Sequence, residues 1–174
     1  INTSTIIDCT GKYEEVTPNI RCWIWPSQHG NENLVDGIKN SCNYFFADLG
    51  HRLATDSKGN YNSELGMERI RKYASDFGLN EKSGVELDEA EPRISTYDPE
   101  RSAMGQANHA FNAAQLARYI TAVANSGSLY KLSIVDKIKD PRNNAVEERS
   151  PELEKTLSYS DVTWNAVHEG LRKV

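Results

Sequence analysis

The stretch "IKNSCNYFFADLG", from Ile38 to Gly50, interrupts an apolar helix pattern with the tripeptide Ser41-Cys42-Asn43. Apolar side chains around it recur at steps of three and four residues, the period of a helix with one buried face; they are Leu34, Ile38, Cys42, Phe45 and Leu49. Serine and asparagine compete for backbone groups inside a helix and favour its ends. The pattern therefore predicts two helices that meet here, with Ser41 capping a second helix that begins near Asn43. Either the junction is ordinary, or it exists to present a hydroxyl and an amide to a cleft.

Composition excludes several classes of protein. The chain has 174 residues, of which 38% are hydrophobic and 26% charged, as in a soluble globular domain with a core of its own. A net charge of -5 leaves no basic surface for phosphates, so we expect no nucleic-acid partner. No apolar run approaches the roughly 20 residues that span a bilayer, and the N-terminus lacks the pattern of a signal peptide. Any membrane attachment is therefore expected outside this chain.

The three cysteines, Cys9, Cys22 and Cys42, are an odd number and allow at most one disulfide. Cys9, Cys22 and His29 could be combined into a metal site, but no CxxC pair and no second clustered ligand accompany them. Buried thiols are the favoured interpretation. We therefore expect no metal site and no cofactor.

The remaining pattern divides the chain into segments. Residues 1 to about 30 mix short β-rich pieces with turn residues, and residues 31–127 contain helices and a long loop from about residue 80 to 111. Residues 128–148 are expected to form a hairpin-like β segment, and Ser160 to cap a C-terminal helix over 160–174 with an apolar stripe. Asn112 and Gln115 form a capping pair for the helix before Gly127. Its expected inward side chains are Leu116, Tyr119, Ile120 and Val123.

Four windows, in this order, resemble the transpeptidase domain of class B penicillin-binding proteins: "HGNENLVDGIKNSCNYFFADLG", "YASDFGLNEKSGVEL", "SAMGQANHAFNAAQLARYITAVANSG" and "VTWNAVHEGLRKV". The resemblance covers nearly the whole chain. It implies a mainly α fold with minor β structure (α+β), the helical lobe of a penicillin-binding-protein or serine β-lactamase-like fold. Residues 1–174 would then be a single partial domain, an internal fragment of a larger enzyme.

In this family a Ser-x-x-Lys motif carries the nucleophile, a Ser-x-Asn motif faces it, and a Lys-Thr/Ser-Gly strand closes the site. The resemblance implies that Ser41 passes a proton toward the leaving amine, and that Asn43 holds the substrate amide and the lysine of the nucleophile. Acyl transfer requires both, because a poor leaving group must be protonated and the carbonyl must be fixed.

Two other matches are expected to be coincidental. Lys82-Ser83-Gly84 spells the third motif but follows Ser41 too soon, so a structural loop is favoured. The only Ser-x-x-Lys, Ser128 to Lys131, leads into a predicted strand, whereas the nucleophile needs a helix start. The chain thus contains neither the nucleophile nor the true third motif, and it alone is not expected to be acylated.

Other polar residues are expected to have structural roles. Ala107 stands where the family usually has glycine, and Gln106 and Asn108 are expected to cap the following helix rather than to line a cleft. The histidines are expected to have loop or surface roles.

The resemblance implies a parent enzyme at the extracytoplasmic face of the bacterial cell membrane that cross-links peptidoglycan stem peptides and is acylated by β-lactams. A non-catalytic ligand-sensing or scaffold module of the same fold is the alternative, and a serine β-lactamase is a third, disfavoured one. Helices deprived of their packing partners would also expose apolar surface, so self-association is expected of the fragment.

Overall fold

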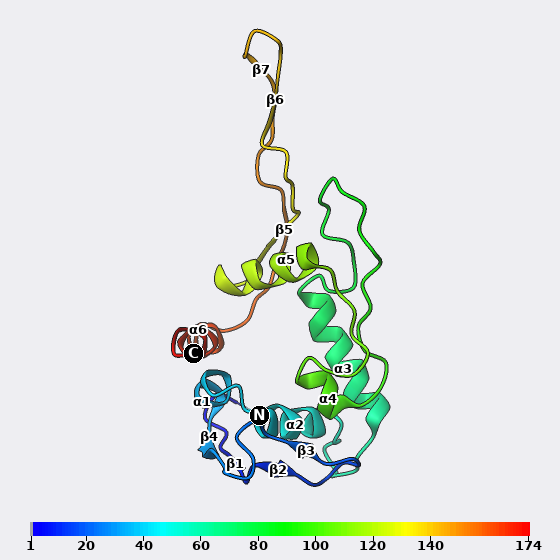
Figure 1. Ribbon diagram of the computed structural model, residues 1–174, viewed down its shortest axis with the longest axis vertical. Coiled ribbons are helices and arrows are strands. Elements are labelled where there is room, and N and C mark those ends of the chain that lie inside the picture. Colours follow the sequence, from blue (N-terminus) through cyan, green and yellow to red (C-terminus); the bar gives the residue numbers. More distant parts are fainter. Residues whose placement is uncertain (1) are drawn as a thin grey trace. The chain divides into compact units, whose positions relative to one another are not determined.

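The computed structural model describes residues 2–174, which form two compact units (Figure 1). Unit 1 comprises Ile1–Tyr73, Ser95–His109 and Tyr159–Val174. Unit 2 comprises Ala74–Ile94 and Ala110–Ser158. Helix α3 (Ser63–Asp76) contributes residues to both, and each unit is described by itself below.

Two short antiparallel ribbons begin unit 1. Strand β1 (Ile7–Cys9) pairs with β4 (Gly30–Glu32), and β2 (Lys12–Tyr13) pairs with β3 (Ile20–Arg21). Helix α2 packs on three of these strands, β1, β2 and β3. The β-rich segment before residue 33 is therefore a support for the helices that follow.

The two expected helices meet at the quoted tripeptide. Helix α1 (Leu34–Lys39) is capped by Asn33, whose side chain accepts from the Asp36 N–H, and helix α2 (Asn43–Leu53) begins where the sequence predicted. The predicted cap was wrong, because Cys42 rather than Ser41 is the N-cap of α2. The Phe45 N–H donates to the sulfur of Cys42 at 3.4 Å.

The core of unit 1 lies between α2 and the ribbons. Its buried residues include Ile7, Cys9, Cys22, Cys42 and Phe45. The predicted stripe is confirmed for Cys42 and Phe45, whereas Leu49 is only partly buried.

Two further helices pack on this part of the chain. Helix α4 (Pro99–Ala103) packs against α2, and α6 (Asp161–Arg172), capped by Ser160 as predicted, packs against α1. Helix α4 lies within the segment expected to be a long loop, so that expectation was incomplete. A Cβ on Gly50 would lie 2.4 Å from the Pro99 carbonyl oxygen, which shows how closely α2 and α4 approach.

Unit 2 is built on α5 (Ala113–Ala124), which carries the predicted capping box of Asn112 and Gln115. Strand β5 (Ser128–Tyr130) pairs with β8 (Leu153–Thr156), and β6 (Lys137–Lys139) pairs with β7 (Ala145–Glu148). The hairpin of β6 and β7 extends away from α5 (Figure 1). Strand β8 was not predicted, because its residues in the run "LEKT" are exposed and do not alternate clearly.

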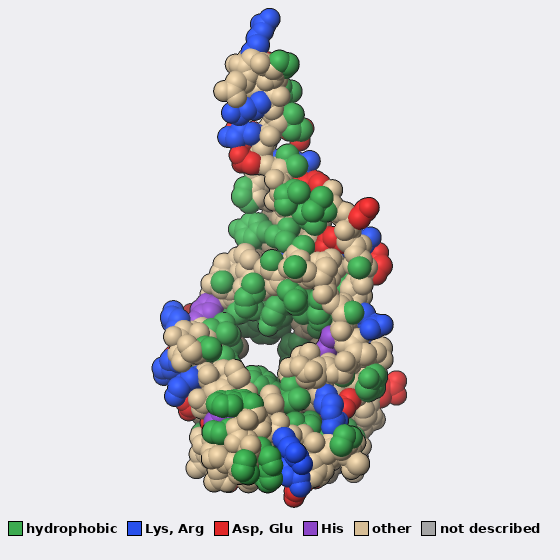
Figure 2. Space-filling model, in the orientation of Figure 1, with side chains coloured by type: hydrophobic (Ala, Val, Ile, Leu, Met, Phe, Trp, Pro, Cys, Tyr) green, Lys and Arg blue, Asp and Glu red, His purple; other side chains and the backbone are tan. Residues whose placement is uncertain are grey.

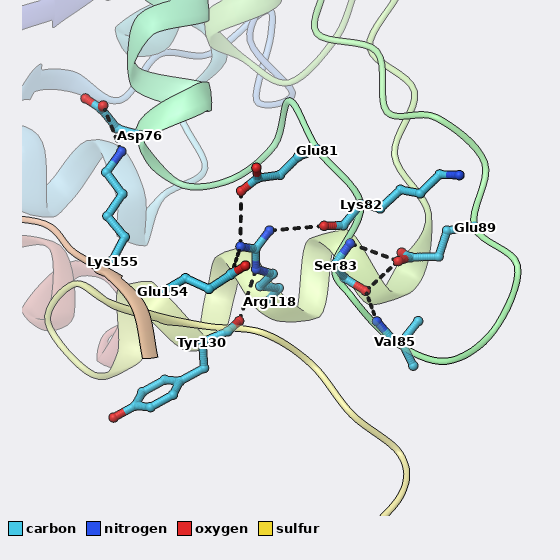
Figure 3. Close-up of polar contacts among 10 residues, drawn as sticks. All are labelled: Asp76, Glu81, Lys82, Ser83, Val85, Glu89, Arg118, Tyr130, Glu154 and Lys155. Atoms are coloured by element: carbon cyan, nitrogen blue, oxygen red, sulfur yellow. Dashed lines mark hydrogen bonds and ion pairs between the residues drawn. The ribbon is translucent and has the colours of Figure 1, made fainter. Parts of the chain in front are cut away.

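The buried face of α5 differs from the prediction. Leu116 and Ile120, expected to point inward, are exposed, while Gln115 and Arg118 are buried. Arg118 is only 2% exposed and binds oxygen atoms of four residues (Figure 3). They are the carbonyls of Lys82 and Tyr130 and the carboxylates of Glu81 and Glu154. Val123 is buried as expected, so the inward face of α5 combines apolar side chains with this polar network.

Candidate active-site junction

Ser41 occupies a strained position between α1 and α2. Its φ of 47° lies in the left-handed region, which costs a non-glycine residue about 1–2 kcal/mol. The turn is fixed on both sides, since the Ser41 N–H donates to the Ile38 carbonyl and the Cys42 N–H to the Gly37 carbonyl, each at 3.0 Å. The Ser41 side chain is exposed. The junction therefore holds a serine at the surface on a rigid support.

Asn43 opens helix α2 and is tied to the neighbouring ribbon. Its side-chain Nδ2 donates to the Arg21 carbonyl of β3 at 3.2 Å. This bond fixes the orientation of the amide. Cys42, the residue between Ser41 and Asn43 in the sequence, is fully buried.

Below the tripeptide, four side chains from separate segments converge. The sulfur of Cys22 lies 3.9 Å from that of Cys42, and Nδ1 of His29 lies 3.5 Å from the Cys22 sulfur and 3.7 Å from the Cys9 sulfur. All three cysteines are free thiols, and burial raises the pKa of the Cys42 thiol above its usual range. The sequence analysis groups Cys9, Cys22 and His29 but leaves out Cys42, because the hydrophobic pattern places Cys42 in an apolar helix stripe.

A second polar group in unit 1 joins α2 to α4. Nδ1 of His51 lies 3.0 Å from Oε1 of Glu100, and the hydroxyl of Tyr61 donates to Oε2 at 3.3 Å. Glu100 is buried, and the rings of His51 and Tyr61 stack with centroids 4.9 Å apart. Burial, followed by the charge of Glu100, raises the pKa of Tyr61. A loop or surface role was expected for the histidines, whereas His51 lies in helix α2 and is partnered by a buried carboxylate. The sequence gives no local sign of this pair, because Glu100 is 49 residues away along the chain.

The loop around Asn108 has a structural role. The Ser95 hydroxyl donates to the side-chain Oδ1 of Asn108 at 2.8 Å, and the Ser95 N–H donates to Nδ1 of His109 at 2.9 Å. The expected capping role of Asn108 and Gln106 was wrong, because Asn112 is the cap of α5. Ala107 has a φ of 65°, a left-handed value that glycine adopts without strain.

The two coincidental motif matches lie where the sequence placed them. Ser83 is buried in a loop, where its N–H and hydroxyl both donate to Oε2 of Glu89 at 2.9 Å (Figure 3). Ser128 begins strand β5. Neither serine has the setting of a nucleophile at the start of a helix.

A strained serine and an anchored asparagine at a helix junction, in a mainly helical α+β chain, are the features expected of the helical part of a serine acyl-transferase. The family model of the penicillin-binding protein transpeptidase domain matches residues 1–174. The chain belongs to this family, as the sequence windows predicted.

Two curated relatives come from Bacillus subtilis (strain 168). Stage V sporulation protein D is 26% identical over 162 residues, which cover 89% of this chain and 23% of the relative. Penicillin-binding protein H is 24% identical over 160 residues, which cover 83% of this chain and 23% of the relative. The chain therefore spans about a quarter of the length of these relatives.

Solved structures confirm the fold. Penicillin-binding protein 2B from Streptococcus pneumoniae matches 98% of this chain with a TM-score of 0.79 and 16% identity, over 31% of its own chain. An imipenem acyl-enzyme complex of penicillin-binding protein A from M. tuberculosis matches 98% with a TM-score of 0.79 and 17% identity, over 38% of its chain. Penicillin-binding protein 2 in complex with MreC, from Helicobacter pylori, matches 99% with a TM-score of 0.75 and 19% identity, over 31% of its chain. The family match over residues 1–174 does not favour the alternative of a sensing or scaffold module.

Across residues 2–174, none of the helices combines the length and the hydrophobicity that crossing a membrane requires.

Proposed function

We propose that this chain is the helical part of a peptidoglycan D,D-transpeptidase, within a single domain to which both units belong. The observation that carries the proposal is the family match over residues 1–174, together with the Ser41-Cys42-Asn43 tripeptide at the junction of α1 and α2. The parent enzyme would cross-link stem peptides at the extracytoplasmic face of the cell membrane. A serine outside these residues would attack the substrate and would be acylated by β-lactams.

In this proposal Ser41 delivers a proton to the leaving amine, and Asn43 positions the substrate amide and the lysine beside the nucleophile. The geometry supports this division of roles. Ser41 is exposed on a turn whose backbone is held by two hydrogen bonds, while the Asn43 amide is already oriented by the Arg21 carbonyl. Preorganised groups of this kind lower the barrier because no reorientation is needed during the reaction.

The test measures acylation of the full-length protein by fluorescent penicillin. We expect Ser41→Ala and Asn43→Ala each to slow acylation by about 10²- to 10⁴-fold, the range for losing a positioned proton-transfer group. Ser128→Ala is the matched control, because it removes the hydroxyl of the coincidental Ser-x-x-Lys match and should leave the rate unchanged. Acylation at the full rate in both junction variants would overturn the assignment.

A second variant separates chemistry from strain. Ser41→Gly removes the same hydroxyl but relieves the left-handed backbone, so it should acylate as slowly as Ser41→Ala while being at least as stable as the wild type. Mass spectrometry of the 174-residue chain after incubation with penicillin should find no adduct. A stoichiometric adduct on that chain would contradict the placement of the nucleophile elsewhere.

We also propose that the exposed apolar side chains of α5 are covered in the complete protein. Leu116 and Ile120 are 45% and 48% exposed, and hydrophobic side chains gather over α5 in Figure 2. The 174-residue chain alone should therefore self-associate. Light scattering that finds only monomer at high concentration, with no binding of a hydrophobic dye, would contradict this.

A further inference from the structure

The convergence of Cys9, Cys22, His29 and Cys42 has a geometry that buried thiols do not require. One ligand atom from each residue, three sulfurs and one imidazole nitrogen, lies within 4.8 Å of every other. The four residues come from the end of β1, the turn after β3, the position before β4 and the cap of α2. Four separate backbone segments therefore bring together four electron-pair donors, three sulfurs and one ring nitrogen.

We propose that these four residues bind one zinc ion in a tetrahedral Cys₃His site. Zn–S bonds of about 2.3 Å and Zn–N bonds of about 2.0–2.1 Å give a tetrahedron whose S–S edges are about 3.8 Å and whose S–N edges are about 3.6 Å. Three of the six separations are 3.9 Å between the Cys22 and Cys42 sulfurs, and 3.5 and 3.7 Å from Nδ1 of His29 to the sulfurs of Cys22 and Cys9. These three are close to the spacing that the ion imposes, and the other three are within 4.8 Å.

The surroundings favour zinc over other occupants. Three thiolates and one imidazole in a tetrahedral arrangement suit zinc, whereas calcium and magnesium prefer oxygen ligands. Cys42 is the N-cap of α2, and the Phe45 N–H donating to its sulfur at 3.4 Å fixes the direction of this side chain. Burial of the three sulfurs closes the site to solvent, as in a structural zinc site.

A disulfide explains the arrangement less well. The sulfurs of Cys22 and Cys42 would have to approach from 3.9 Å to about 2.0 Å, and the buried Cys9 and the partly buried His29 would remain beside them with no shared role. Nδ1 of His29 is the ring nitrogen that faces the sulfurs. The other ring nitrogen, Nε2, is buried and has no hydrogen-bond partner.

The site has a consequence that rests on the proposed function. Cys42 is the central residue of Ser41-Cys42-Asn43, so a zinc ion would anchor the strained junction to β1 and to the segments containing Cys22 and His29. Cys42 would then be a positioning residue for Ser41 and Asn43 without touching the substrate.

The test measures metal in the full-length protein, purified with its thiols reduced. Elemental mass spectrometry should find about one zinc ion per chain in the wild type, and a large loss of zinc in Cys22→Ser and His29→Ala. His168→Ala, which removes an imidazole outside the cluster, is the matched control and should retain the ion. Cobalt substitution should give thiolate-to-cobalt charge-transfer absorption together with the visible bands of tetrahedral cobalt.

The outcomes are separable from those of the acylation experiment. No bound metal, metal that survives both ligand substitutions, a cobalt spectrum without thiolate absorption, or a Cys22–Cys42 disulfide in the reduced preparation would each overturn the site. Should the variants fail to fold, the wild-type cobalt spectrum decides. A protein that binds zinc but is not acylated would refute the proposed function and leave the metal site standing.

Discussion

The two units each bury a polar cluster, and the clusters differ in what they lack. In unit 2 the guanidinium of Arg118 meets two carboxylates and two carbonyl oxygens, so the cation has its acceptors within the chain. In unit 1 the atoms of Cys9, Cys22, His29 and Cys42 are all potential ligands, and no cationic side chain is among them. The cluster around Arg118 already contains its cation. The cluster of cysteine and histidine side chains contains only potential metal ligands, which is why we propose that it binds a cation.

The largest expected effect separates the units by their response to a chelator. In the reduced full-length protein, removing zinc should strongly increase amide exchange in peptides covering residues 7–9, 20–22 and 41–45, and should leave residues 113–131 unchanged. An ion whose free concentration is 1,000 times its dissociation constant stabilises the folded state by about 4 kcal/mol. Cys22→Ser should show no further response to the chelator. An equal response in both units would break the distinction drawn here.

The next effect concerns Arg118. Arg118→Ala leaves the Lys82 and Tyr130 carbonyls without their donor and separates Glu154 from its partner, so unit 2 should lose about 3 kcal/mol of unfolding free energy. Arg118→Lys should lose less, because it keeps the positive charge. It should still lose some stability, because an ammonium group cannot bind in several directions at once as the guanidinium does.

Urea unfolding with amide exchange over residues 79–85 and 128–131 measures this loss. The exposed Arg142→Ala provides the control and should change stability by less than about 0.5 kcal/mol. A loss for Arg118→Ala no larger than the control would show that the network contributes nothing.

The sequence predicted the parts of both units that depend on local signals. The helix junction at Ser41, the capping box at Asn112 and the cap at Ser160 follow from side chains that bond the backbone nearby, and all lie as expected apart from the exchange of Ser41 for Cys42 as a cap. The family resemblance also followed from the sequence alone.

The missed features depend on contacts between distant segments. Arg118 is buried on the face of α5 where Leu116 was expected, because its oxygen partners come from other parts of the chain. Glu100 reaches His51 for the same reason, through the close approach of α4 to Gly50. Hydrophobic periodicity shows which side chains are apolar. It does not show which charged side chains are buried because they bind oppositely charged or polar groups from distant segments.

A smaller effect tests backbone strain in unit 1. Ala107 has a φ of 65°, so Ala107→Gly should stabilise unit 1 by about 0.5–1 kcal/mol, the relief of strain exceeding the entropy that glycine adds to the unfolded chain. Ala103→Gly is the matched control, since it makes the same substitution in helix α4 and should destabilise the unit by about 1 kcal/mol. Changes of the same sign in both variants would refute strain as the cause.

The smallest expected effect is the acid response of an exposed ion pair in unit 2. Glu86 accepts from the Ser133 hydroxyl at 2.6 Å and from the Ile134 N–H at 3.0 Å, and it pairs with Arg149 at 2.7 Å. These bonds, that from Ser133 above all, lower the pKa of Glu86 from 4.5 to about 2. A carboxyl group with a lowered pKa stabilises the fold above its ordinary pKa, and that contribution is lost as the pH falls through its pKa in the folded state.

Glu86→Gln should therefore exchange amide hydrogens over residues 131–136 faster than the wild type at neutral pH, and the difference should shrink as the pH falls from about 4.5 to about 2. Comparing both proteins at each pH removes the intrinsic pH dependence of exchange. Glu91→Gln, in the same loop but paired with Lys82, should leave these residues unchanged. A difference that persists undiminished at pH 2 would mean that the carboxylate charge of Glu86 does not hold this segment.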